Sequence, residues 1–65
     1  MALWKVYLRT KRKDGTYEWV AVRRRFQDPR DAQAMGDEAM AAANRRHPHR
    51  YQEGHVIRTK VMQTK

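Results

Sequence analysis

The sequence contains no cysteine, only three glycines and two prolines, and no apolar run longer than a few residues. Without cysteine, a disulfide framework, a thiolate zinc site and a cysteine nucleophile are all excluded. The short apolar runs exclude a membrane-spanning helix and a signal peptide. We therefore expect a cytoplasmic protein with no membrane among its partners.

Motifs of catalysis and metal binding are also absent. There is no Gly-rich phosphate loop, nucleophile elbow or carboxylate pair. His49 or His55, with Glu53 and Arg50, have the chemistry for acid–base cleavage of RNA, but nothing in the sequence fixes their geometry. A zinc site needs three or four ligands. The chain offers His47, His49 and His55 but no cysteine, and the nearest carboxylate is that of Glu53. We expect loop histidines, no metal, no cofactor and no enzymatic activity.

Positive charge is what the chain has in excess. Its 65 residues include 15 Lys and Arg against 7 Asp and Glu, a formal net charge of +8. Residues 1–27 carry eight basic and two acidic side chains. Residues 28–44 carry one basic and four acidic side chains, and residues 45–65 carry six basic side chains and one acidic side chain. The middle segment is thus acidic and its flanks are basic. A one-sided basic surface attracts polyanions over long range.

Two strands are predicted before residue 27, because apolar and polar residues alternate in 1–13 and β-branched and aromatic residues dominate 16–26. Two registers compete. A two-residue loop would place Val6 opposite Arg23, whereas a three-residue loop, Lys13–Gly15, places Val6 opposite Val22. We prefer the second register, because it keeps the apolar residues on one face and suits a type I turn with a left-handed glycine.

A helix and a third strand follow. Asp28 is a good N-cap and Pro29 suits the first helical position, while Pro48 ends the helix. Apolar and small residues recur at three- and four-residue spacing from 32 to 43 and form one stripe. The third strand covers residues 55–62, but its parity is ambiguous.

The predicted fold is α+β with the order β-β-α-β, a three-stranded sheet of order 2-1-3 and one helix packed on one face. Residues 1–65 form a single small domain. The crossover through the helix returns the third strand beside the first. The predicted core residues are Trp4, Val6, Leu8, Val20, Val22, Phe26, Met35, Ala39, Met40, Ala43, Ile57 and Val61.

This architecture is similar to small domains that read DNA through a three-stranded sheet, in the arm-binding domains of phage-type integrases and in plant ethylene-response-factor domains. In those domains the three strands precede the helix, whereas here one strand follows it. The similarity is one of architecture, so no residue role is carried over. Short basic proteins of this kind also occur in phages and mobile elements, often as inhibitors of host proteins.

The sheet face without a helix is the predicted site. In the preferred register Arg9 lies opposite Trp19 and Lys5 opposite Arg23, with Tyr17 on the same face. Cations would contact phosphates, and rings would stack or pack on the sugar–phosphate surface. The candidate residues are Lys5, Tyr7, Arg9, Lys11, Trp19, Arg23, Arg25 and Arg58. We predict a nucleic-acid-binding module for DNA or RNA. The alternative is a protein-interaction module, either a homodimer or an inhibitor of a host protein.

Overall fold

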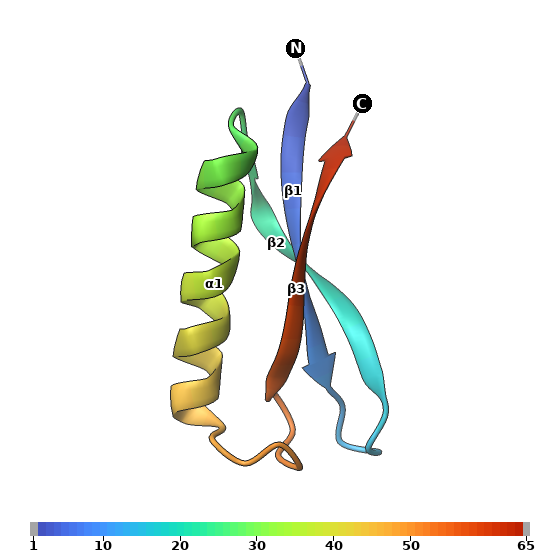
Figure 1. Ribbon diagram of the computed structural model, residues 1–65. Coiled ribbons are helices and arrows are strands. Elements are labelled where there is room, and N and C mark those ends of the chain that lie inside the picture. Colours follow the sequence, from blue (N-terminus) through green and yellow to red (C-terminus); the bar gives the residue numbers. More distant parts are fainter. Residues whose placement is uncertain (1, 65) are drawn as a thin grey trace.

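The computed structural model describes residues 2–64, which form a three-stranded sheet with one helix on one side (Figure 1). The elements are β1 (Leu3–Lys11), β2 (Tyr17–Phe26), α1 (Pro29–Arg46) and β3 (Val56–Thr64). The sheet order is β2-β1-β3, and β1 is antiparallel to both neighbours. The predicted α+β fold and strand order are confirmed.

The hairpin between β1 and β2 has the predicted three-residue loop. The Arg12 amide donates to the Thr16 carbonyl over 2.7 Å, and Gly15 adopts a left-handed φ of 91°. The Asp14 carboxylate accepts hydrogen bonds from the Thr16 amide and hydroxyl. These bonds stabilise the charged form and hold the pKa of Asp14 below its ordinary value. The turn thereby fixes the register of the lower half of the hairpin.

The upper half of the hairpin departs from the predicted register. Between Lys5 and Tyr7 the pairing with β2 shifts, so that Lys5 faces Arg25 and not Arg23. Two additional residues of β2 are accommodated there, and Trp4 consequently faces Phe26. Phe26 is buried, with 7% of its surface exposed. The uninterrupted register would set Trp4 against a charged arginine, so burial of the phenyl ring accounts for the irregularity.

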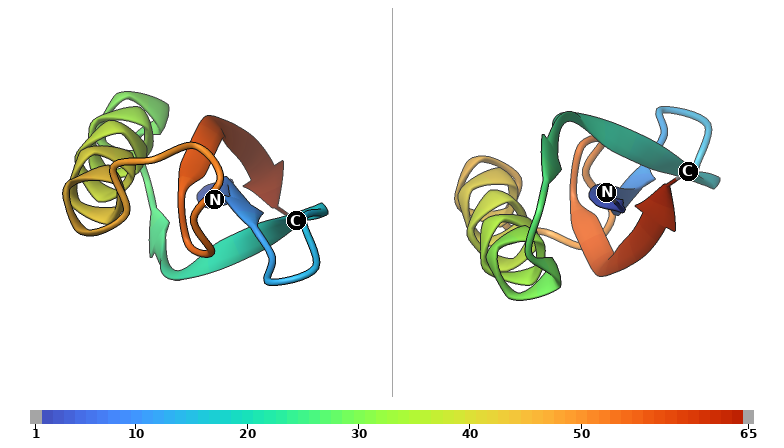
Figure 2. Two further views of the ribbon diagram at one scale, coloured as in Figure 1. Left: turned by 90° about the horizontal axis from the view of Figure 1, so that it is seen from below. Right: turned by 90° about the horizontal axis from the view of Figure 1, so that it is seen from above.

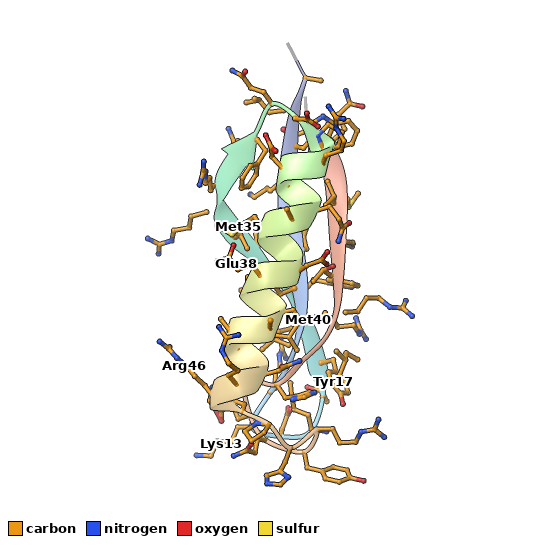
Figure 3. All side chains as sticks on the ribbon, turned by 60° about the vertical axis from the view of Figure 1, so that its left-hand side comes forward. Lys13, Tyr17, Met35, Glu38, Met40 and Arg46 are labelled. Atoms are coloured by element: carbon orange, nitrogen blue, oxygen red, sulfur yellow. The ribbon has the colours of Figure 1, made fainter. Side chains whose placement is uncertain are left out.

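The helix is bounded as the sequence predicts. Asp28 is the N-cap, and its carboxylate accepts from the Arg30 amide over 2.8 Å. The Arg30 guanidinium also donates to this carboxylate, which lowers the pKa of Asp28 and raises that of Arg30. The last turn carries Arg45 and Arg46, which complement the negative end of the helix dipole. Figure 3 shows Arg46 projecting outward from this end of the helix.

The helix packs closely on the middle of the sheet. Gly36 is buried, and a Cβ atom added there would lie 3.0 Å from the Val6 Cγ1 atom and 3.6 Å from the Thr59 Cβ atom. Val6 and Ala32 are fully buried beside it. The small residues Gly36 and Ala32 of the helix stripe therefore permit a close approach between α1 and the sheet. The core also includes partly buried side chains of Trp4, Leu8, Val22, Met35 and Val61.

Two predicted core residues are wrong. Val20 is 42% exposed, because the lower part of β2 twists away from the helix (Figure 1). Ile57 is 46% exposed, and Val56, at 2%, takes the inward position. The cause is a bulge, since Arg9 pairs with Arg58 but Thr10 pairs with Val56. The extra residue reverses the parity at the beginning of β3.

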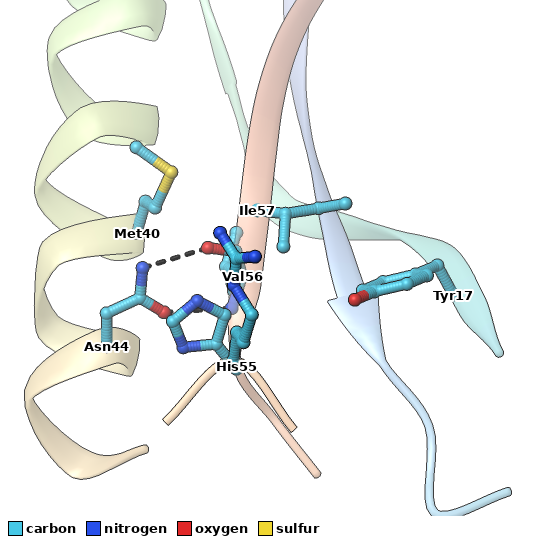
Figure 4. Close-up of a pocket in the computed structure, with 7 residues that line it drawn as sticks. Tyr17, Met40, Asn44, His55, Val56 and Ile57 are labelled. Carbon is cyan, nitrogen blue, oxygen red and sulfur yellow. Dashed lines mark hydrogen bonds between the residues drawn. The ribbon is translucent and has the colours of Figure 1, made fainter. Parts of the chain in front are cut away.

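The helix secures this bulge through one side chain. The Asn44 amide donates to the Val56 carbonyl, and its oxygen accepts from the Val56 amide, both over 2.8 Å (Figure 4). Asn44 thus pairs with β3 as a neighbouring strand would. At the other end of the sheet, Leu3 pairs with Thr64, whose hydroxyl donates to the Leu3 carbonyl over 3.2 Å. β1 and β3 are therefore joined along their whole lengths.

No helix within residues 2–64 has the length and apolar character that crossing a membrane requires.

Candidate nucleic-acid interface

The face of the sheet opposite α1 is not covered by another element of the described chain. Views along the strands show the helix to one side of the three strands only (Figure 2). Residues of alternate parity on β1 point to this side, and their partners on β2 and β3 share it. We call the following nine residues the basic face: Lys5, Tyr7, Arg9, Lys11, Tyr17, Trp19, Arg25, Arg58 and Lys60.

Cross-strand pairing arranges the basic face in rows. One row joins Arg25 to Lys5, a second sets Lys60 beside Tyr7, a third joins Trp19, Arg9 and Arg58, and a fourth joins Tyr17 to Lys11. Every row therefore contains at least one cation. Because residues two apart on a strand are separated by about 6.6 Å, the four rows place positive charge at regular intervals along the sheet.

The Lys60 side chain crosses the sheet. It begins on β3, yet its Nζ atom lies 4.2 Å from the centroid of the Trp19 ring on β2 and 5.4 Å from that of Tyr7 on β1. A cation over an aromatic face is attracted by the ring quadrupole, by about 0.5–1 kcal/mol at exposed sites. The rings of β1 and β2 thereby hold a charge that originates on the far strand.

The three cations of β1 also lie beside aromatic rings. Arg9 is 5.4 Å from the Trp19 centroid and 5.8 Å from that of Tyr17. Lys11 lies 4.8 Å from Tyr17, and Lys5 lies 5.9 Å from Tyr7. These side chains are half-buried, so their stems lie along the sheet while their charged groups stay in contact with water.

Carboxylates do not neutralise the basic face. The ion pairs found among residues 2–64 are Arg12–Glu18 at 2.8 Å and Arg30–Asp28 at 3.0 Å, and neither involves a residue of the basic face. Lys5 instead faces Arg25, and Arg9 faces Arg58, both directly across the ladder. Like charges in such positions destabilise a sheet. The face therefore concentrates positive charge at a cost to the fold.

Seven of the eight residues predicted from the sequence lie on the basic face. Arg23 is the exception: it is exposed in the irregular part of β2 and has no partner in the β1 register. Lys60 and Tyr17 were not among the eight. Strand parity placed Tyr17 on this face, whereas the parity of the third strand was ambiguous. The ring contacts of Lys60 depend on a side chain long enough to reach across β1, and no local pattern signals that.

The histidine-containing loop offers a different surface. His55 lies beside an open hollow lined by Tyr17, Met40, Asn44, Arg50, Val56 and Ile57 (Figure 4). Its Nδ1 atom is 2.7 Å from the His47 carbonyl, and the Asn44 amide is engaged with β3. Within residues 2–64, no three His, Asp or Glu side chains are placed to hold one metal ion. Asn44 thus joins α1 to β3, and His55 joins the two ends of the loop between them.

Comparisons with known proteins give no match: no protein-family model, no curated protein and no solved structure matches this chain.

Proposed function

We propose that the protein binds nucleic acid, with its basic face contacting the phosphate groups. The observation that carries this proposal is the set of six cations aligned on one face of the sheet, with no carboxylate paired to any of them within residues 2–64. Phosphates are the anions that a nucleic acid supplies in a regular row. The six cations are Lys5, Arg9, Lys11, Arg25, Arg58 and Lys60.

The energetics of the face support a polyanion as its ligand. A cross-strand pair of like charges costs a few tenths of a kcal/mol up to about 1 kcal/mol, and the face contains two such pairs, Lys5–Arg25 and Arg9–Arg58. A sheet selected only for stability would place oppositely charged or neutral residues there. Proteins depart from such local rules chiefly at functional sites. A bound polyanion reverses the unfavourable term, because it lies between the repelling cations.

The dimensions also suit a nucleic acid. From Lys5 to Lys11 the face extends about 20 Å along β1, at about 3.3 Å per residue. At about 3.4 Å per base pair along the helix axis, this length corresponds to about six base pairs. The expected footprint is therefore shorter than one turn of double helix.

A protein-interaction module is the second proposal, and the structure favours it less. The large apolar side chains that are most exposed, Val20, Tyr51, Ile57 and Met62, are spread over β2, the loop after α1 and β3. Two copies joined through their basic faces would bring twelve cations together, which opposes a homodimer. A protein partner of this face would have to be acidic.

Direct binding to labelled duplex DNA, single-stranded DNA and RNA tests the proposal. We expect binding at 50 mM salt that weakens steeply by 200 mM, since each phosphate contact releases counterions. Arg9→Gln should weaken binding several-fold. The matched control is Arg46→Gln, which removes the same charge from the end of α1 and should leave affinity nearly unchanged. Absence of binding at 50 mM salt, or binding insensitive to salt, would contradict the proposal.

Light scattering of the free protein separates the second proposal from the first. A monomer that binds oligonucleotides supports nucleic-acid binding. A dimer that persists in Arg9→Glu but dissociates in Trp19→Ala would instead support a protein interface through the rings.

A further inference from the structure

Each aromatic ring of the basic face is already accompanied by two cations. The Trp19 ring has Lys60 at 4.2 Å and Arg9 at 5.4 Å. The Tyr7 ring has Lys60 at 5.4 Å and Lys5 at 5.9 Å. The Tyr17 ring has Lys11 at 4.8 Å and Arg9 at 5.8 Å. The rings therefore hold four of the six cations of the face in position: Lys5, Arg9, Lys11 and Lys60.

This arrangement opposes base stacking. Proteins that bind single strands offer aromatic faces on which successive bases lie. Here a base can lie on Trp19 only if the Lys60 ammonium first leaves the ring, and the same holds for Tyr7. A phosphate makes no such demand, because an ammonium above a ring still directs N–H groups outward to a phosphate oxygen.

We propose that the basic face binds the phosphate backbone of a double helix and reads no base sequence. This inference rests on the proposed function and names its ligand class. Cations from three strands lie within an area about 20 Å long and about 10 Å wide, given strand spacings near 4.8 Å. A duplex carries one charge per about 1.7 Å of axis, twice the density of one of its strands. A preorganised cation array gains more from the denser anion.

Lys60 distinguishes phosphate binding from stacking, because its removal has opposite effects in the two modes. Lys60→Gln deletes the proposed phosphate contact and removes the nearer of the two cations beside Trp19. Backbone binding predicts a several-fold loss of duplex affinity and no gain in affinity for single strands. It also predicts that the slope of log affinity against log salt concentration decreases by about 1, the value for one phosphate contact. Stacking predicts a higher affinity for single strands. Lys60→Arg keeps the charge over the ring and should retain the affinity of the natural chain.

Tyr51 provides an internal control. Its ring is 80% exposed in the loop after α1, with Lys11 5.7 Å from its centroid. It is the described ring most open to a base, and it lies beyond the nine residues of the basic face. Because Lys11 keeps the nearer Tyr17 ring at 4.8 Å, Tyr51→Ala should lower duplex affinity less than Lys60→Gln does. A loss larger than that of Lys60→Gln would overturn the inference in favour of stacking on this loop.

The experiment uses the full chain with 12-base-pair DNA and RNA duplexes of two sequences each and with the corresponding single strands. The expected result is tighter binding to duplexes than to single strands, equal affinity for the two sequences, and the Lys60→Gln loss described above. The DNA and RNA arms show which double helix is preferred. Tighter binding of single strands, or a sequence preference of tenfold or more, overturns this inference but leaves nucleic-acid binding intact. Binding to none of the probes overturns the proposed function itself.

Discussion

Arg58 faces Arg9 across the ladder between β1 and β3, and the cost of that pairing is measurable. Arg58→Thr removes one of the two charges and introduces a residue favoured in strands. We expect the free energy of unfolding to rise by a few tenths of a kcal/mol up to about 1 kcal/mol, while affinity for nucleic acid falls. Urea denaturation and a binding titration measure the two effects.

The control for this residue is Arg23→Thr. Arg23 is also an exposed arginine on a strand, but no β1 residue pairs with it. The two variants share the change in strand propensity and in net charge, so their difference isolates the like-charged pair. Equal changes in stability would show that the Arg9–Arg58 pairing carries no energetic cost.

At the scale of the elements, the contact between α1 and the sheet depends on Gly36. Alanine at this position gains about 1 kcal/mol of helix propensity, but its methyl group would lie 3.0 Å from the Val6 Cγ1 atom. Val6 is fully buried and has little room to move. Because overpacking costs about 1–3 kcal/mol, we expect Gly36→Ala to lower the free energy of unfolding by about 1 kcal/mol, measured by denaturant titration.

A double-mutant cycle tests whether contact with Val6 causes this loss of stability. Val6→Ala removes the methyl groups that oppose the new side chain, at the cost of a cavity. The double variant should therefore be less destabilised than the sum of the two single variants. Strict additivity would show that the helix moves away without strain and that the close approach at Gly36 is not required.

The elements also show where sequence reasoning succeeds. Alternation in β1 predicted which side chains share the basic face, because strand parity is a local property. Asp28 and Pro29 predicted where α1 begins, because helix capping is also determined by neighbouring residues in the sequence. The pairing of Lys5 with Arg25 was missed because it depends on burying Phe26 against Trp4, a contact between distant residues.

The beginning of β3 was mispredicted for a similar reason. The bulge that turns Val56 inward and Ile57 outward is held by Asn44 from the helix. A strand pattern read alone contains no sign of this partner. The ring contacts of Lys60 are likewise non-local, since they join β3 to β2 across β1. Local chemistry thus predicted the candidate face, and tertiary contacts determine how its charges are held.

For the whole molecule, net charge predicts opposite effects of salt on folding and on binding. The chain carries a formal net charge of +8. Salt would weaken the attraction within the two ion pairs of its described part. Repulsion among the cations of the basic face is screened over about 10 Å at 0.1 M salt. We expect the urea midpoint to rise between 10 and 200 mM NaCl, while affinity for nucleic acid falls over the same range.

A decrease in the urea midpoint with added NaCl would contradict this expectation, because it would mean that attractive charge pairs dominate the folded state. Arg58→Thr provides the matched comparison. With one repelling charge removed, its midpoint should respond less to NaCl than that of the natural chain.

The pairing of Leu3 with Thr64 has a consequence for how the chain can be connected. Since the beginning of β1 and the end of β3 lie side by side (Figure 1), a short linker between these two residues would close the backbone into a ring. Opening that ring at the hairpin turn, near Gly15, gives a circular permutant in which β2, α1 and β3 precede β1. Both ladders and all nine residues of the basic face would be retained. The basic face therefore depends on how the strands pair and not on the order in which they follow one another along the chain.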